Sequence, residues 1–355
     1  MVSTALLSLV RCPECRHALR DQTGEGGAQL VCEGCSRRYR RSPEGFLDLR
    51  PAVQFSEQTK YLDAALHADA RHERVSPPLL GSKIRNDMLR AFLSPGRADR
   101  VVDLGCGSGR ALLWNRDWQS TTVGVDIAPF FSADALRDVD LLLADLRRLP
   151  FADGTFTKAY SLDVLEHLSP DALRAMLAEA NRVLAPGGAL FVYTHVRKNA
   201  AIARGLRAIN ALARVLERIG LIDMRQERLR KSDHVNPLRD IPELDAVARE
   251  TGFRIARIRY YTPIVGGFVE NIMMRVAERA MARRAATRLS AAGAADPQAA
   301  AIREARTAAK SKIASSPATL AALRGLSFAM KLDVLLFGRI RSGPFFALLE
   351  KPRNP

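Results

Sequence analysis

The segment VVDLGCGSGR, residues Val101–Arg110, joins a short apolar run to an acid and three alternating glycines. The apolar run predicts a buried strand that ends at Asp103. Gly105, Gly107 and Gly109 permit a tight turn whose backbone approaches a ligand closely. Apolar residues then predict the start of a helix. A strand, a glycine turn and a helix start together present backbone N–H groups to a small molecule.

The downstream pattern separates this turn from a nicotinamide site. The spacing here is G-x-G-x-G, tighter than the dinucleotide pattern G-x-G-x-x-G, and such a turn is weak evidence on its own. Two further predicted strands, Thr121–Asp126 and Leu141–Asp145, each end in an acid. Asp126 lies at a suitable distance along the chain to reach ribose hydroxyls.

The next segment continues the alternation of strands and helices. Phe156–Val164 predicts a fourth strand, and a helix is expected from Glu166 through Arg182. The sequence LAPGG at 184–188 should stop that helix, because proline and glycine end helices. Ala189–Thr194 predicts a fifth strand.

As a set, these motifs resemble the class I S-adenosylmethionine (SAM)-dependent methyltransferases with a methyltransferase type 11-like domain. The resemblance is close over residues 91–200 and loose over 241–352. It implies an α/β fold with a Rossmann-like, seven-stranded sheet. A helix at Ile241–Glu250, a sixth strand at Phe253–Tyr261 and a last strand at 345–350 would complete that sheet.

The resemblance also implies the cofactor-binding positions, which are Asp103, Gly105, Gly107, Gly109, Asp126, Asp145 and Leu146. Asp103 and the backbone of the glycine turn would hold the amino acid end of SAM. Asp126 would accept hydrogen bonds from the ribose. Asp145 would accept from the adenine amine, with Leu146 as a backbone donor. Alternatively, Asp126 and Asp145 could each be the N-cap of a helix. Their positions at the ends of successive strands disfavour this alternative.

Polar residues also follow the fourth and fifth predicted strands. Asp163, Glu166, His167 and His195 fall at carboxyl ends of strands, where open parallel sheets bind ligands. His195 is the first candidate for a general base and Asp163 the second, the alternative being a purely structural histidine. Methyl transfer from a sulfonium relies on positioning, and a base is needed only when the acceptor must lose a proton.

Four of the five cysteines form two Cys-x-x-Cys pairs near the N-terminus, Cys12, Cys15, Cys32 and Cys35. This spacing predicts a structural zinc ribbon at residues 1–50, with no open coordination position. The module resembles the activator subunit of tRNA methyltransferases. It would either stabilise the catalytic domain or contact RNA. The apolar N-terminus MVSTALLSLV, residues 1–10, is expected to form a strand of this module rather than a signal peptide.

The remaining divisions follow changes in composition. Residues 51–96 are expected to form a helical linker or cap, and 97–265 the SAM-binding domain, which contains a basic helical insert at 197–236. A second basic helical insertion would span 266–343, and 344–355 would hold the last strand and tail. The face Ile202, Leu206, Ile209, Leu212, Leu216 and Ile219 makes the first insert amphipathic, and His234 and Asn236 at its exit are expected to line the acceptor pocket.

The chain is strongly basic, with a formal net charge of +16 and a pI near 10.2. Residues 197–231 contain ten basic and three acidic side chains, and 271–341 contain thirteen and four. Such charge favours an anionic partner, although generally arginine-rich composition is an alternative. No apolar run is long enough to span a bilayer. We therefore expect a cytoplasmic protein, peripheral at the inner membrane face if it binds lipid.

Two acceptor classes compete. An amphiphilic or lipid-linked small molecule would suit basic inserts with long apolar faces at an anionic membrane surface. Ribosomal or transfer RNA would suit the ribbon and the arginines. RNA binding favours exposed aromatic residues, and these are only 6% of the chain, so the small molecule is preferred. A catalytically silent SAM-fold binding protein is a third hypothesis.

Overall fold

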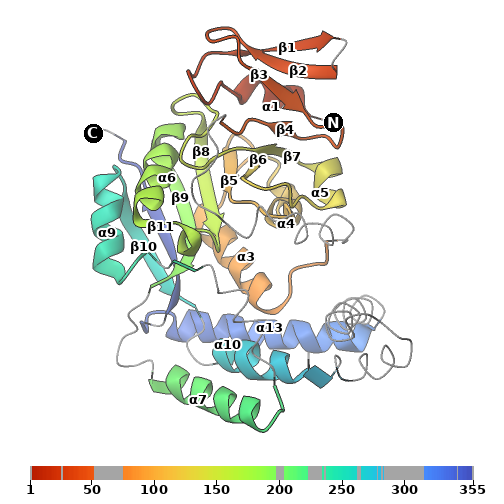
Figure 1. Cartoon of the computed structure of the whole chain (residues 1–355). Coiled ribbons are helices and arrows are strands. Elements are labelled where there is room, and N and C mark those ends of the chain that lie inside the picture. Colours follow the sequence, from red (N-terminus) through yellow and green to blue (C-terminus); the bar gives the residue numbers. More distant parts are fainter. Residues whose placement is uncertain are drawn as a thin grey trace.

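The computed structural model describes residues 2–24, 27–51, 75–196, 204–222, 234–235, 237–261, 265–277, 279–280, 283, 316–341 and 343–353. Its centre is a twisted sheet (Figure 1). Seven strands follow the order β7 (Asp140–Leu143), β6 (Thr121–Asp126), β5 (Arg100–Leu104), β8 (Phe156–Leu162), β9 (Leu184–His195), β11 (Pro344–Glu350) and β10 (Arg254–Tyr260). The first five are parallel, and β11 is antiparallel to both neighbours. The predicted seven-stranded α/β sheet is confirmed.

Helices pack on both faces of this sheet and create two apolar cores. One core lies beneath α6 (Pro170–Val183) and α9 (Ile241–Glu250). The other lies beneath α3 (Leu80–Leu93) and two short helices, α4 (Arg110–Trp114) and α5 (Ala133–Asp138). Consecutive residues of a strand point to opposite faces, which explains why central strands read as continuous apolar runs.

Most of the N-terminal apolar segment is a helix, so the strand expected within residues 1–10 is wrong. Helix α1 spans Thr4–Leu9, and Ser3 caps it by accepting a hydrogen bond from the Leu6 amide. A serine cap satisfies one of the amides that a helix start leaves unpaired. Periodicity alone does not distinguish a short apolar strand from a short buried helix.

The single helix expected from Glu166 to Arg182 is also wrong. A 3-10 turn spans Leu165–His167, and α6 begins separately at Pro170, capped by the Ser169 hydroxyl. The break arises because proline disfavours helical backbone at the preceding residue. At the other end, α6 stops at Val183, directly before LAPGG as predicted, and β9 starts at Leu184.

The zinc-ribbon module extends the same sheet. Its strands β1 (Leu19–Gly24), β2 (Gly27–Cys32), β3 (Arg38–Arg41) and β4 (Leu47–Asp48) form an antiparallel ribbon. Strand β4 then pairs in parallel with β7, so the complete sheet has eleven strands. Leu6, Leu47 and Leu49 are fully buried in the core beneath α6. The module therefore shares both hydrogen bonds and core with the central domain.

A second addition consists of three helices, named here the helical layer. These are α7 (Arg204–Arg218), α10 (Val265–Phe268), which continues through a π-helix at Val269–Met273, and α13 (Pro317–Phe337). The chain enters α7 after β9 and α10 after β10, and it leaves α13 towards β11. Given the strand directions, all three connections lie at the carboxyl edge of the sheet (Figure 1).

Specific polar contacts hold the helical layer on α3. The Leu80 amide donates to Ser327 Oγ at 2.8 Å, and Lys331 Nζ to Asp87 Oδ2 at 2.8 Å. Within the layer, Asp333 Oδ2 of α13 accepts a hydrogen bond from the Val265 amide at the start of α10, at 2.8 Å. The expectations for Ile202, Asn236 and much of the basic insertion at 266–343 lie outside the described residues, as do those for 52–74 of the linker. The proposed domain boundaries remain predictions.

Candidate functional site

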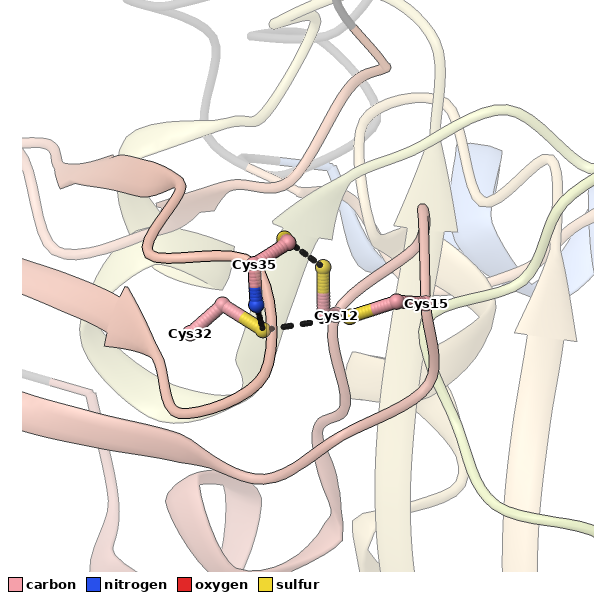
Figure 2. Close-up of side chains that lie close together, drawn as sticks. All are labelled: Cys12, Cys15, Cys32 and Cys35. Atoms are coloured by element: carbon pink, nitrogen blue, oxygen red, sulfur yellow. Dashed lines mark hydrogen bonds between the residues drawn. The ribbon is translucent and has the colours of Figure 1, made fainter.

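The four N-terminal cysteines converge at one point of the ribbon (Figure 2). Cys12 Sγ lies 3.7 Å from Cys35 Sγ, Cys15 Sγ lies 3.3 Å from Cys32 Sγ, and all four sulfurs lie within 4.8 Å of one another. Tetrahedral zinc with Zn–S bonds of about 2.3 Å places its sulfurs about 3.8 Å apart. The cluster therefore fits the zinc ribbon that the spacing predicts.

The backbone around Cys32 favours the thiolate that zinc requires. The amides of Gly34 and Cys35 donate to Cys32 Sγ at 3.3 and 3.4 Å. Burial raises the pKa of this thiol, but these amides and the Cys15 thiol outweigh it and lower the pKa to about 6. Four cysteine ligands leave no position for substrate, so a zinc ion here would be structural.

The glycine turn is shaped by two different requirements. Gly105 has φ +85°, and a Cβ there would lie 2.3 Å from Val164 Cγ2, so this glycine is required by close packing. Gly107 also has positive φ, but a Cβ there would meet nothing within 4 Å. The turn is therefore open at Gly107. Gly109 is the N-cap residue of α4.

The amides of the turn already have partners. Gly105 N donates to Val125 O at 2.8 Å, and Gly107 N donates to Asp126 Oδ2 at 2.7 Å. Any contact of these two residues with the amino acid end of SAM would therefore use their carbonyl oxygens, which suit its ammonium group. Asp103 next to the turn is 2% exposed, and burial raises its pKa well above the usual range.

The two downstream acids, Asp126 and Asp145, have different partners. Asp126 accepts backbone amides on both oxygens, the second from Ala128 at 3.0 Å. Since each carboxylate oxygen has a second lone pair, it can still accept ribose hydroxyls. Asp145 instead forms a close ion pair with Arg147, 3.0 Å from Oδ2 to Nη2. Neither acid caps a helix, because α5 is capped by Ser132 and no helix follows Asp145 directly.

Arg147 is a functional candidate that the sequence reasoning missed. It also donates its backbone amide to Asp145 Oδ1 at 2.8 Å. The arginine therefore occupies the carboxylate assigned to the adenine amine, and the two groups would have to share it. In the sequence, the one sign of the ion pair between Asp145 and Arg147 is their two-residue spacing.

At the carboxyl edge, Asp163 faces an arginine. Its backbone has φ +57°, a conformation that costs a non-glycine residue free energy and often marks functional sites. Its Oδ2 lies 3.8 Å from Nε of Arg85, which also stacks 5.3 Å from the ring centre of Tyr193. Tyr261 donates to Glu270 Oε1 beside this group at 2.7 Å. Sequence patterns missed this cluster, because its members come from four separate segments.

A second cluster gathers three histidines around Glu166. The ring centres of His167 and His234 are 4.6 Å apart, and those of His195 and His234 are 5.3 Å apart. His195 Nδ1 lies 3.9 Å from Glu166 Oε1. Burial, together with the charge of Asp163, raises the pKa of Glu166 to about 8. His234 thus lies beside the base candidate His195, and its place in an acceptor pocket stays a prediction.

Comparison with known families agrees with the strand order and the glycine turn. Residues 102–192 match a family model described as a methyltransferase domain. Residues 102–192 therefore form a methyltransferase domain. The match begins within β5 and ends within β9, so it spans the predicted cofactor half.

Relatives of this methyltransferase domain act on different acceptors. A sterol 4-C-methyltransferase of Caenorhabditis elegans is 33% identical over 107 residues, 28% of this chain and 31% of that protein. A Mus musculus protein named "Probable tRNA methyltransferase 9B" is 35% identical over 108 residues, 30% of this chain and 24% of that protein. The chain thus spans a third or less of these two relatives.

Among solved structures, phosphoethanolamine N-methyltransferase 2 of Haemonchus contortus with bound SAM is similar, with a TM-score of 0.45 and 16% identity. That similarity covers 77% of this chain and 54% of the other. The names of the relatives differ in acceptor, so they leave the acceptor of this protein undetermined.

Proposed function

We propose that the protein transfers a methyl group from SAM to an amphiphilic or lipid-linked small molecule at an anionic membrane surface. The observation that carries the choice of acceptor is the exposed apolar surface of the helical layer, which lies over the carboxyl edge of the sheet. In open α/β folds that edge is where ligands bind.

The cofactor would lie against the open side of the glycine turn. Bound SAM supplies an electrophilic methyl group on a sulfonium. Asp126 would orient the ribose, and Asp103 beside the turn would face the amino acid end. His195 would accept the acceptor's proton where one must be lost, with Asp163 as second candidate. Asp163 lies close to Arg85, an arrangement that suits a role in binding.

The apolar stripe of α13 supports an amphiphilic partner. Phe328 is 62% exposed and Leu336 is 70% exposed, whereas Met330 and Val334 on the other face are buried. Several large apolar side chains in the described part of the layer and directly beside it are exposed. They are Leu212, Val215, Ile219, Phe268, Met273, Val276, Phe328, Leu332, Leu335, Leu336 and Phe337. Exposed apolar surface of this extent marks interaction sites.

Charge on the same layer favours an anionic surface. Arg214 and Arg218 of α7 are exposed beside these apolar residues. Ala213 and Leu216 of α7 pack inward, against Ile222 and Ile272. Of the expected apolar face, Leu212 and Ile219 are exposed, and Leu216 is partly buried. Within the described residues, no helix has both the length and the apolarity needed to cross a bilayer.

The cofactor half of the proposal is tested by calorimetry with SAM. We expect Asp126→Ala to lose SAM binding and Asp153→Ala to keep it, because Asp153 lies on a turn at the opposite edge and its side chain is 72% exposed. Wild-type protein that binds no SAM would instead support a silent binding protein.

The acceptor half is tested with methyl-labelled SAM, purified protein and extract from cells lacking it. Total lipid, RNA, protein and polar metabolites are then separated and counted. Label in the lipid fraction supports the proposal. Label in RNA contradicts it and favours the alternative that the ribbon and basic inserts bind rRNA or tRNA.

A further inference from the structure

We propose that Glu166, His167 and His234 form a second metal site, which binds a divalent transition-metal ion at the carboxyl edge of the sheet. This site is separate from the cysteine cluster. It would hold the ion where an acceptor meets the methyl group.

The ligand atoms already converge. One side-chain atom each from Glu166, His167 and His234 lies within 4.8 Å of the others. Ligands bound at about 2.0–2.2 Å to one ion lie roughly 3–4 Å apart, so small side-chain rotations complete the site. The rings of His167 and His234 are nearly perpendicular, at 88°. Such a crossed pair lets two ring nitrogens point at one ion.

The carboxylate is oriented as a metal ligand usually is. Thr194 on β9 donates its hydroxyl to Glu166 Oε2 at 3.0 Å. The other oxygen, Oε1, is turned towards the histidines, 3.9 Å from His195 Nδ1. Hydrogen bonds of this kind fix ligating carboxylates and are worth about 10–100-fold in metal affinity.

Because Glu166 is buried, a bound cation would stabilise the charged form of its carboxylate. Glu166 is 2% exposed, and an unneutralised buried carboxylate is costly. Imidazole nitrogen with carboxylate oxygen suits Zn²⁺, Fe²⁺ or Co²⁺ better than Mg²⁺ or Ca²⁺, which prefer oxygen ligands alone. Three protein ligands are typical of zinc sites that keep a position open.

The location links the open position to the acceptor. Val164 packs against Gly105 in the cofactor turn, and Glu166 follows two residues later. An ion here would bind an oxygen of the acceptor near the turn. Binding of the acceptor by the ion rests on the proposed function, whereas binding of the ion to the protein does not. Such binding would limit the acceptor to a molecule with a hydroxyl, phosphate or carboxylate oxygen.

The site is tested on the full chain with its cysteines loaded with one zinc ion. Co²⁺ is then titrated and followed by calorimetry and visible absorption. We expect one Co²⁺ per chain with ligand-field bands but without thiolate-to-cobalt charge transfer. His234→Ala should weaken binding at least about tenfold, and Thr194→Val about tenfold. Asp171→Asn, whose side chain is fully exposed, should bind like wild type.

Two results would overturn the site: no second ion in the wild type, or equal Co²⁺ affinity in wild type and His234→Ala. Unchanged SAM binding by the variants shows that they are folded. Co²⁺ binding by a protein that transfers no methyl group supports the metal site and contradicts the proposed function. Methyl transfer at full rate by His234→Ala without the second ion contradicts only the acceptor role of the metal.

Discussion

The ribbon and the helical layer are both additions to the same seven-stranded sheet, yet they join it differently (Figure 1). The ribbon continues the sheet through β4 and buries leucines in its core. The helical layer lies across the carboxyl edge and leaves large apolar side chains exposed. The first arrangement suits stabilisation, and the second suits contact with a partner. Both regions are basic, so charge alone does not separate their roles.

The largest expected effect is loss of the ribbon's metal. Chelation of zinc, or Cys32→Ser, should unfold the ribbon and uncover β7, because structural zinc supplies folding free energy directly. We expect Tm to fall by roughly 10 °C or more, given 2–4 °C per kcal/mol for domains of this size. Thermal unfolding with zinc analysis measures this. Cys106→Ala, outside the cluster, should keep its zinc; an unchanged Tm after zinc loss would contradict the stabilising role.

Truncating one leucine in each region compares the ribbon directly with the helical layer. Leu47→Ala in the ribbon removes a fully buried side chain and should cost about 2–5 kcal/mol in the free energy of unfolding. Leu336→Ala in the helical layer removes one that is 70% exposed and should change it by no more than about 0.5 kcal/mol. Chemical denaturation measures both. Equal losses would show that the layer's apolar surface is covered in solution.

A smaller effect concerns the attachment of α13 to α3. Burial raises the pKa of Asp87, but hydrogen bonds from Lys331 and Lys83 outweigh it, so the pKa is lowered on balance. The stabilisation is therefore present above the ordinary carboxyl pKa and is lost as pH falls through the lowered value. Asp87→Asn should cost about 1 kcal/mol at neutral pH.

The check is the difference in Tm between wild type and Asp87→Asn across a pH series. It should shrink in acid, where both side chains are neutral. A difference that stays constant with pH would show that charge is not what attaches the helix.

Much of the sheet was predictable because its strands are apolar on both faces and end in acids. The cofactor half and the cysteine cluster needed only local patterns. The prediction of a strand at residues 1–10 is wrong because Ser3 caps a helix there. The pairing of β4 with β7 was not predictable, since it joins residues nearly a hundred positions apart.

In the candidate site, too, local sequence predicts some groupings of residues and not others. Asp103 and the glycines come from one contiguous segment, so their grouping follows from spacing. The pairing of Arg85 with Asp163 depends on how α3 packs across the sheet edge, which no local pattern records. The convergence of His234 on His167 likewise depends on the chain returning to that edge after α7.

The most direct test is vesicle binding by matched charge reversals in the two regions. Arg214→Glu with Arg218→Glu alters the helical layer, and Arg38→Glu with Arg40→Glu alters exposed residues of the ribbon by the same charge. Each arginine near an anionic surface contributes about 1 kcal/mol. With phosphatidylserine vesicles, we predict at least about tenfold weaker binding for the helical-layer variant and wild-type binding for the ribbon variant. Equal effects of the two reversals, or no binding to vesicles by the wild type, would contradict the account.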